Sequence, residues 1–251
     1  MSRLNEILHH QDVQAEKFRN ELKYLCSEGE LRILQHRVQN LCLPDPHAGS
    51  DGVYQIRSIY FDDSENRYFH ENEDGTDPRE KFRIRIYNAS DSRITLECKK
   101  KERSMTHKDS AVLTKAQFQK ILAGELSSAD IDSPLLEKLY LLHQQRDLEP
   151  KVIVAYERTP FVYNFGNVRI TFDRNIGSTT DLNSFFDPYL PLRPILPLGK
   201  QILEVKYDEL LPDFLYHAMS LGSLQQTTYS KYNLSRKYTV KVTICIFGNK
   251  Y

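Results

Sequence analysis

The 251-residue chain contains no tryptophan, three methionines and four cysteines, and it carries no net charge. Its 34 lysines and arginines equal its 34 acidic residues, so bulk attraction to DNA or to an anionic membrane is not predicted. The cysteines (Cys26, Cys42, Cys98 and Cys245) are scattered without a CxxC pair, which excludes a zinc pattern and a disulfide framework. Any function that uses charge must therefore depend on how the charges are arranged.

Long hydrophobic runs are also missing. No segment approaches the roughly 20 apolar residues of a membrane-spanning helix, and residues 1–10 lack the apolar run of a signal peptide. We therefore predict a cytoplasmic protein with no membrane span in this chain; whether it has a membrane partner is left open. Length and composition predict one domain, residues 1–251, and the 15 tyrosines and 12 phenylalanines provide aromatic surface for its core.

The clearest pattern is the strict alternation of residues 81–87. Lys81, Arg83 and Arg85 share one face of a β-strand, and the apolar residues between them share the other. By itself this pattern fits a solvent-facing strand equally well. Similar alternation recurs along the chain, which favours a common role. Strands are predicted at 18–25, 54–62, 81–87, 93–99, 151–158, 168–173, 201–207 and 238–247.

Helices and loops are predicted between these strands. Apolar spacing predicts a helix over 28–42, ended by Pro44. Thr114 is a candidate N-cap for a helix over 115–123 that ends at Gly124. A further helix begins at Ser133-Pro134 and is broken by Pro150. Short helices are predicted at 2–14 and 212–221, and loops at 71–79 and 177–200.

Helices would pack on the apolar strand faces, which leaves the charged faces pointing toward each other. We therefore predict an α+β fold: a closed or nearly closed antiparallel β-barrel with a charged lumen and helices packed outside. The predicted lumen holds nine cations and three carboxylates: Arg19, Glu21, Lys23, Lys81, Arg83, Arg85, Glu97, Lys99, Arg158, Arg169, Glu204 and Lys206.

So many buried cations are costly without partners, so the lumen must be wet and hold a polyanion or a metal. Arginine forks and lysine ammoniums suit phosphoryl oxygens, and glutamates suit a divalent ion that bridges them. The alternative is a set of ordinary surface ion pairs, each of small energetic value.

Eight short motifs in this order resemble the VTC domain, the polyphosphate polymerase branch of the triphosphate tunnel metalloenzyme (CYTH-like) superfamily. The resemblance covers about residues 17–235. Its motifs are RNELKY (19–24), SIYFD (58–62), KFRIRIY (81–87), LECK (96–99), YER (156–158), RITFD (169–173), LEVK (203–206) and SKY (230–232).

The resemblance implies an eight-stranded antiparallel tunnel that transfers the γ-phosphate of ATP onto a growing polyphosphate chain, with Mn²⁺ or Mg²⁺. Carried over by position, the catalytic phosphate-gripping residues are Lys23, Arg83, Arg85, Lys99, Arg158, Arg169 and Lys231. Further substrate contacts are Tyr156, Ser230 and Lys108, and the lumen pattern adds Lys81 and Lys206. Glu204 is the leading metal ligand; Glu21 and Glu97 are weaker candidates, because they could equally be salt-bridged to neighbouring lysines.

Two positions depart from the family pattern. Arg19 stands where the hydrolytic members of the superfamily carry a glutamate, and Thr228 where polymerising members often carry a lysine. The expected partners are ATP and inorganic polyphosphate or triphosphate; nucleic acid is disfavoured because the lumen is too narrow for a duplex. Two alternatives remain: a hydrolase of tripolyphosphate or nucleoside triphosphates, and a non-catalytic module that binds polyphosphate or nucleotide, which Thr228 modestly supports.

Overall fold

The computed structural model describes residues 18–103, 105–222 and 224–237. The predicted helix at 2–14 and the predicted strand at 238–247 lie outside these residues. Within the described ranges, none of the helices combines the length and the hydropathy of a membrane-crossing segment.

A single antiparallel sheet runs through the molecule, in the strand order β11-β1-β10-β8-β7-β3-β4-β5-β6. Its long strands are β1 (Asn20–Ser27), β3 (Tyr54–Asp62), β4 (Arg79–Tyr87), β5 (Ile94–Glu102), β6 (Met105–Leu113), β7 (Glu149–Tyr163), β8 (Val168–Thr179) and β10 (Lys200–Tyr207). Three further strands have two residues each. β2 (Leu43–Pro44) pairs with β7, β9 (Arg193–Pro194) pairs with β8, and β11 (Gln225–Gln226) pairs with β1.

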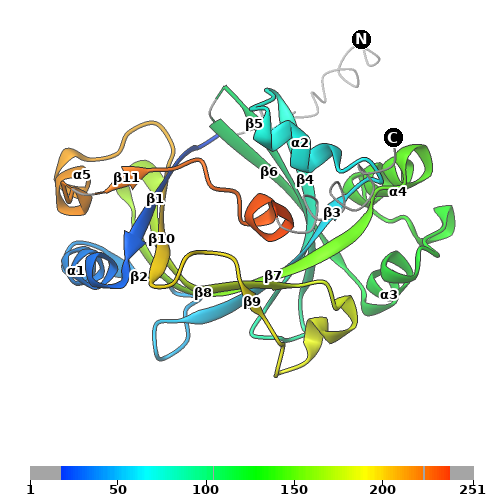
Figure 1. Ribbon diagram of the computed structural model, residues 1–251, viewed down its shortest axis with the longest axis horizontal. Helices are drawn as coiled ribbons and strands as arrows, with labels where there is room; N and C mark the ends of the chain where they lie inside the picture. Colours follow the sequence, from blue (N-terminus) through cyan, green and yellow to red (C-terminus); the bar gives the residue numbers. More distant parts are fainter. Residues whose placement is uncertain (1–17, 104, 223, 238–251) are drawn as a thin grey trace, which may run out of the picture.

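The sheet curls into a half-barrel (Figure 1), which confirms the predicted α+β fold with a curved antiparallel sheet. The chain at the start of β1 meets β6 through one isolated bridge. There Arg19 and Thr106 exchange two backbone hydrogen bonds of 2.9 Å. The edges of the half-barrel therefore touch at one point instead of along a full ladder.

The two faces of the curled sheet differ as the alternation predicts. Phe82, Ile84 and Ile86 of β4 are fully buried on the outer side, whereas Lys81, Arg83 and Arg85 line a cavity on the inner side. Full burial of an aliphatic or aromatic side chain stabilises a fold by roughly 1.5–3 kcal/mol, so the outer face is the core and the inner face is free to carry charge.

Helices cover the outer face at both ends of the sheet (Figure 1). Helix α1 (Glu28–Gln39) and helix α5 (Asp213–Met219) pack with β8 and β10 in one apolar cluster. Helix α3 (Lys115–Ala123) and helix α4 (Pro134–Arg146) pack with β3, β4, β5 and β7 in the other. These helices agree with the prediction that helices pack outside the sheet.

Capping residues define where helices α3 and α4 begin and end. Thr114 caps α3 by accepting the backbone N–H of Gln117, and Gly124 ends the helix at φ 71°, both as predicted. Helix α4 ends at Arg146, followed by Asp147 at φ 53°. The prediction that Pro150 breaks this helix is wrong. Pro150 lies in β7 at an irregularity in the pairing with β3, where the ladder tolerates a residue without an N–H.

The structure also differs from the predicted secondary structure in three other segments. Helix α2 (Arg67–Glu73) extends into the predicted 71–79 loop; its first N–H groups are bound by Asp62 and Asp63, too far upstream to be recognised as caps. Strand β6 occupies residues that were not predicted as a strand. Within the predicted 177–200 loop, β8 continues to Thr179 and β9 forms.

The last described segment, residues 231–237, is helical and was not predicted as a helix. It lies inside the curve of the sheet (Figure 1), so the prediction that the helices pack outside does not hold for this segment. Its residue Tyr232 is almost fully buried and donates a hydrogen bond to Asp62 at the end of β3. This contact fixes the segment against the inner face and brings Lys231 into the cavity.

Candidate functional site

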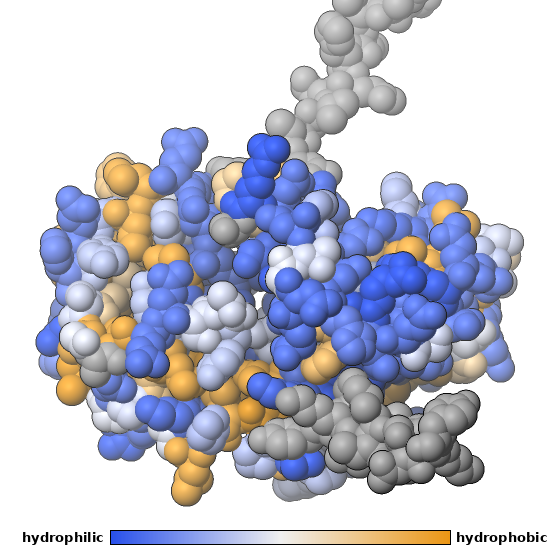
Figure 2. Space-filling model, turned by 45° about the horizontal axis from the view of Figure 1, so that its top comes forward, coloured by the Kyte–Doolittle hydropathy of each residue, from blue (hydrophilic) through white to orange (hydrophobic). Residues whose placement is uncertain are grey.

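The inner face of the half-barrel encloses a cavity of about 670 Å³. Figure 2 shows a face that is hollowed between two halves of the molecule, with hydrophilic residues predominating on the right. Thirteen lysines and arginines line the cavity, against two glutamates. Every residue that the sequence nominated for the site lines it, except Glu97. The structure therefore brings the predicted site residues together, from strands far apart in the sequence.

A second cavity, of about 190 Å³, lies between α3, α4 and the start of β7. It is lined mainly by leucine, isoleucine and other apolar residues, with no lysine or arginine. Phosphates need cationic partners, so the larger cavity is the candidate site.

Glu97 of β5 lies behind the cavity wall and is 2% exposed. Its carboxylate accepts hydrogen bonds from Arg83 Nε at 2.6 Å and Lys108 Nζ at 2.8 Å, and Arg85 Nη1 is 3.7 Å away. Burial acts to raise the pKa of Glu97, but Arg83, Arg85 and Lys108 outweigh it and hold the pKa well below its usual range. Glu97 is thus a permanent counter-ion that positions three of the nominated cations.

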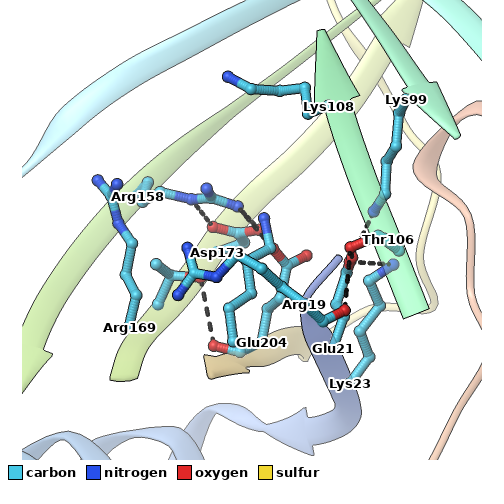
Figure 3. Close-up of polar contacts among 12 residues, drawn as sticks. Arg19, Glu21, Lys23, Lys99, Thr106, Lys108, Arg158, Arg169, Asp173 and Glu204 are labelled. Atoms are coloured by element: carbon cyan, nitrogen blue, oxygen red, sulfur yellow. Dashed lines mark hydrogen bonds and ion pairs between the residues drawn. The ribbon is translucent and has the colours of Figure 1, made fainter. Parts of the chain in front are cut away.

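Glu21 of β1 occupies a second cluster, on the right of Figure 3. Its carboxylate forms ion pairs with Lys99 and with Lys23, the latter at 2.8 Å, and accepts a hydrogen bond from Thr106 Oγ1 at 3.4 Å. Burial raises the pKa of Glu21, but the two ammonium groups outweigh burial and leave the pKa far below its ordinary value. The predicted salt bridges to neighbouring lysines are therefore present.

The third cluster surrounds Asp173 and Glu204 (Figure 3). Arg158 donates two hydrogen bonds to Asp173, Nε at 2.6 Å and Nη2 at 2.8 Å, and Lys231 Nζ lies 2.7 Å from the same carboxylate. Lys206 Nζ is 2.8 Å from Glu204, while Lys231 is 3.9 Å from it. Burial opposes ionisation, yet Lys206, Lys231 and Arg158 hold the pKa of Glu204 well below its usual range.

Tyr156 and Ser230 complete this wall of the cavity. The Tyr156 ring lies 4.7 Å from Lys231 Nζ and 5.3 Å from the Arg158 guanidinium carbon, distances that fit cation–π contacts. Ser230 Oγ accepts a hydrogen bond from Lys81 Nζ at 3.4 Å. Both residues therefore position cations of the cavity.

Arg169 lies at another edge of the cavity, where it donates a hydrogen bond to the Tyr54 hydroxyl at 3.1 Å and forms an ion pair with Asp45. Arg19 forms an ion pair of 2.7 Å with Asp208. Asp45 lies in a loop without an alternating pattern, which explains why the sequence did not identify it, whereas Asp208 lies one period beyond Glu204 and Lys206, just after the end of β10.

The site also contains residues that the sequence could have identified. Asp173 shares a face with Arg169 in the alternating strand 168–173, and it is fully buried at the centre of the third cluster. Tyr60 accepts a hydrogen bond of 3.2 Å from Arg83 Nη1. Arg79 and Lys101 follow the same alternation as Lys81 and Lys99, and both line the cavity. The alternation of strand 93–99 already places Lys101 on the charged face, and extending the pattern of strand 81–87 back by one period would have found Arg79.

The profile of the VTC domain matches residues 18–240, most of the chain. The chain belongs to the VTC domain family. No curated protein matches this VTC domain in sequence.

Solved structures share the fold of this VTC domain at low sequence identity. A candidate adenylyl cyclase from Hippeastrum, described as having a dominant triphosphatase activity, is 12% identical with a TM-score of 0.51. That match covers 88% of this chain and 96% of the other. A candidate adenylate cyclase from Bacillus halodurans is 13% identical, with a TM-score of 0.46 and coverage of 93% and 91%. PH1819 from Pyrococcus horikoshii OT3 is 14% identical, with a TM-score of 0.45 and coverage of 88% and 98%.

The resemblance to tunnel enzymes implies a divalent metal ion, for which the carboxylates of the VTC domain are the candidate ligands. In the part of the chain that the structure describes, no group of three or more histidine, cysteine or acidic side chains is arranged to hold a metal ion. Mg²⁺ and similar ions that enter with phosphates need only one or two carboxylates. Glu204 and Glu21 line the cavity and fit that requirement, whereas Glu97 does not line it.

Proposed function

We propose that this VTC domain is a polyphosphate polymerase that transfers the γ-phosphate of ATP onto a growing chain of inorganic polyphosphate. The observation that supports this proposal is the charge of the cavity: thirteen cations and two carboxylates line one enclosed space. A linear polyanion would neutralise this surplus, and an antiparallel half-barrel offers an elongated surface along which such a chain can extend.

Phosphoryl transfer requires alignment of the attacking and leaving oxygens and neutralisation of the transferred charge, so no protein nucleophile is needed. In the proposed reaction, a terminal oxygen of the polyphosphate chain attacks the γ-phosphorus of ATP. The bond between that phosphorus and the β,γ-bridging oxygen breaks, and ADP leaves. The chain gains one phosphate.

The nominated arginines would bind the phosphates of both substrates. Arg83 and Arg158 are held in place by Glu97 and Asp173 before substrate arrives, so their fixed positive charge requires little rearrangement as the transition state forms. Lys231 is fixed against Asp173 and the Tyr156 ring, beside Glu204. We assign Lys23, Arg85, Lys99, Lys108, Arg169 and Lys206 to further phosphate contacts.

Mn²⁺ or Mg²⁺ would contribute further neutralisation of the phosphate oxygens when bound. Glu204 is our leading ligand, since it lines the cavity among the proposed phosphate-binding cations, and Glu21 is the second. We retain Glu97 as the weakest of the three. We also propose that the chain acts in the cytoplasm, where ATP is available, and that residues 1–251 form one domain.

Two alternatives have specific support. Hydrolysis of tripolyphosphate or nucleoside triphosphates would use the same cavity with water as the acceptor, and the triphosphatase activity described for the Hippeastrum protein favours it. A non-catalytic binding module is favoured by Thr228, which lines the cavity where polymerising members often carry a lysine.

The product of ATP turnover separates these functions. The purified protein is incubated with ATP and Mn²⁺, and the phosphate products are resolved by gel and by phosphorus NMR. A polyphosphate ladder with matching ADP supports the polymerase. Orthophosphate with ADP, or turnover of tripolyphosphate, supports the hydrolase; tight binding without turnover supports the binding module.

A further inference from the structure

One part of the cavity wall holds cations that no carboxylate balances. Arg79 and Lys81 of β4 and Lys101 of β5 line the cavity, and among the described residues none of the three forms an ion pair. Each of the other ten lysines and arginines that line the cavity pairs with an aspartate or a glutamate. Those ten cations share six carboxylates, so some positive charge is in excess along the whole wall, but the cations without any carboxylate partner among the described residues are confined to this one region.

The strand register concentrates this charge. Arg79 lies directly opposite Lys101, and Lys81 directly opposite Lys99, so two successive cross-strand pairs join like charges on one face. Like charges directly opposite each other destabilise a sheet. Two such pairs lie side by side here, and all four side chains are half-buried. This arrangement indicates a ligand of opposite charge.

The side-chain hydrogen bonds of Arg79 and Lys81 go to neutral groups. Arg79 donates to the carbonyl of Thr76 at 2.7 Å, and Lys81 donates to Asn72 Oδ1 at 3.0 Å and to Asn233 Oδ1 at 2.9 Å. Burial and the neighbouring cations lower the pKa of Lys81 and that of Lys101. An anion bound here would relieve both the repulsion and the desolvation.

The position of the cluster limits what can reach it. Arg79 lies six residues from Arg85 on the same face of β4, which corresponds to roughly 20 Å along an antiparallel strand. Arg85 shares its counter-ion Glu97 with Arg83. A ligand that contacts these arginines and the unpaired cluster at once must be long, linear and anionic throughout.

We propose that Arg79, Lys81 and Lys101 form a subsite for the acceptor chain, binding phosphates of a linear inorganic polyphosphate that lie beyond its reacting end. This assignment rests on the proposed function. It also gives the cavity a direction, because the acceptor chain extends from the paired arginines toward the start of β4.

The test measures binding without turnover. Tripolyphosphate and long-chain polyphosphate are each titrated calorimetrically into the wild type, the double variant Arg79→Ala/Lys101→Ala, and the control Lys100→Ala/Arg103→Ala, at one salt concentration. The control removes the same charge from neighbouring positions, Lys100 in β5 and Arg103 just after it, and neither of these residues lines the cavity. The single variant Lys101→Gln replaces the double variant if the latter does not fold.

We expect the double variant to lose affinity for long-chain polyphosphate by about tenfold, as two half-exposed contacts would give, and to keep its affinity for tripolyphosphate. Lys101→Gln should lose about threefold, and the control should match the wild type. An equal loss for both ligands, no loss for either, or an equal loss in the control would overturn the subsite. A wild type that binds neither ATP nor tripolyphosphate would instead refute the proposed function itself.

Discussion

Glu97→Gln is predicted to weaken the fold and strengthen the binding of phosphates. In the wild type, the Glu97 carboxylate is 2% exposed and balances Arg83, Arg85 and Lys108. Removing one partner of a buried ion pair costs about 3–5 kcal/mol, because it leaves charge buried without compensation. Glutamine keeps the shape and one acceptor oxygen, so we expect a loss near the lower value, about 3 kcal/mol. For a domain of this size, that lowers the melting temperature by about 6–12 °C.

Ligand should reverse much of this loss. A ligand at a hundred times its dissociation constant stabilises the native state by about 2.7 kcal/mol. Because the two guanidiniums lose their counter-ion in the variant, tripolyphosphate should bind the variant more tightly and raise its melting temperature more than that of the wild type. Thermal unfolding followed by circular dichroism, with and without tripolyphosphate, measures both effects. The matched control is Glu102→Gln, which removes an exposed partner of Lys100 and should change stability by less than about 0.5 kcal/mol.

The dependence on pH has a definite sign. The pKa of Glu97 is depressed in the folded state, so its stabilising contribution is present at neutral pH and is lost as the pH falls below the unfolded value of about 4.3. The wild type and Glu97→Gln should therefore converge in stability in acid. Destabilisation below about 1 kcal/mol at pH 7, or equal stabilisation of both proteins by tripolyphosphate, would refute the counter-ion role.

Three further predictions test the cavity. Arg83→Ala should weaken tripolyphosphate binding by about tenfold to a hundredfold in calorimetric titrations, since a hydrogen bond to a charged group is lost; unchanged affinity would contradict its place among the phosphate contacts. Glu204→Ala should abolish metal-dependent turnover of ATP and reduce ATP binding only partly, and full activity would exclude this carboxylate as a ligand. Burial and the nearby Arg79 lower the pKa of Lys81 to about 7. A polyanion binds the protonated form, so its affinity should fall as the pH rises through 7. Lys81→Arg, which stays charged, should show a shallower fall in the same titrations, and parallel profiles for the two proteins would count against the assignment.

Alternation predicted most of the site, because a strand places every second side chain on one face whatever its neighbours are. This rule grouped the charged residues of β1, β4, β5, β8 and β10 on the face that lines one cavity, with Glu97 lying behind the wall as the exception. It could not show which carboxylate neutralises which cation. That pairing depends on how strands far apart in the chain come together, as Glu21 of β1 and Lys99 of β5 do.

The elements and residues that the sequence failed to predict also share a cause. Helix α2 is capped by Asp62 and Asp63 from the end of the preceding strand, at a spacing that no local capping rule covers. Strand β6 lacks a clean alternation, because His107 and Asp109 share its outer face with Met105, Ala111 and Leu113, and its pairing with β5 is what defines it. The counter-ion Asp45 of Arg169 lies in a loop. In each case a tertiary contact, which one sequence does not display, determines the structure.

The pairing of β1 with β10 has a consequence for how the protein is made. The partner of Ser27 is Lys200, so the ribosome must add more than 170 residues before this ladder can form. At about 5–20 residues per second, that takes roughly 10 to 35 seconds. During this interval, β1 lacks its ladder partner and the apolar side chains of β8, β10 and α5 that complete the cluster around Leu22, Tyr24 and Cys26, whereas those of α1 are already made. A strand that supplies Glu21 and Lys23 to the cavity thus remains without its ladder partner while most of the described residues are made, and chaperone binding to it during translation would protect it.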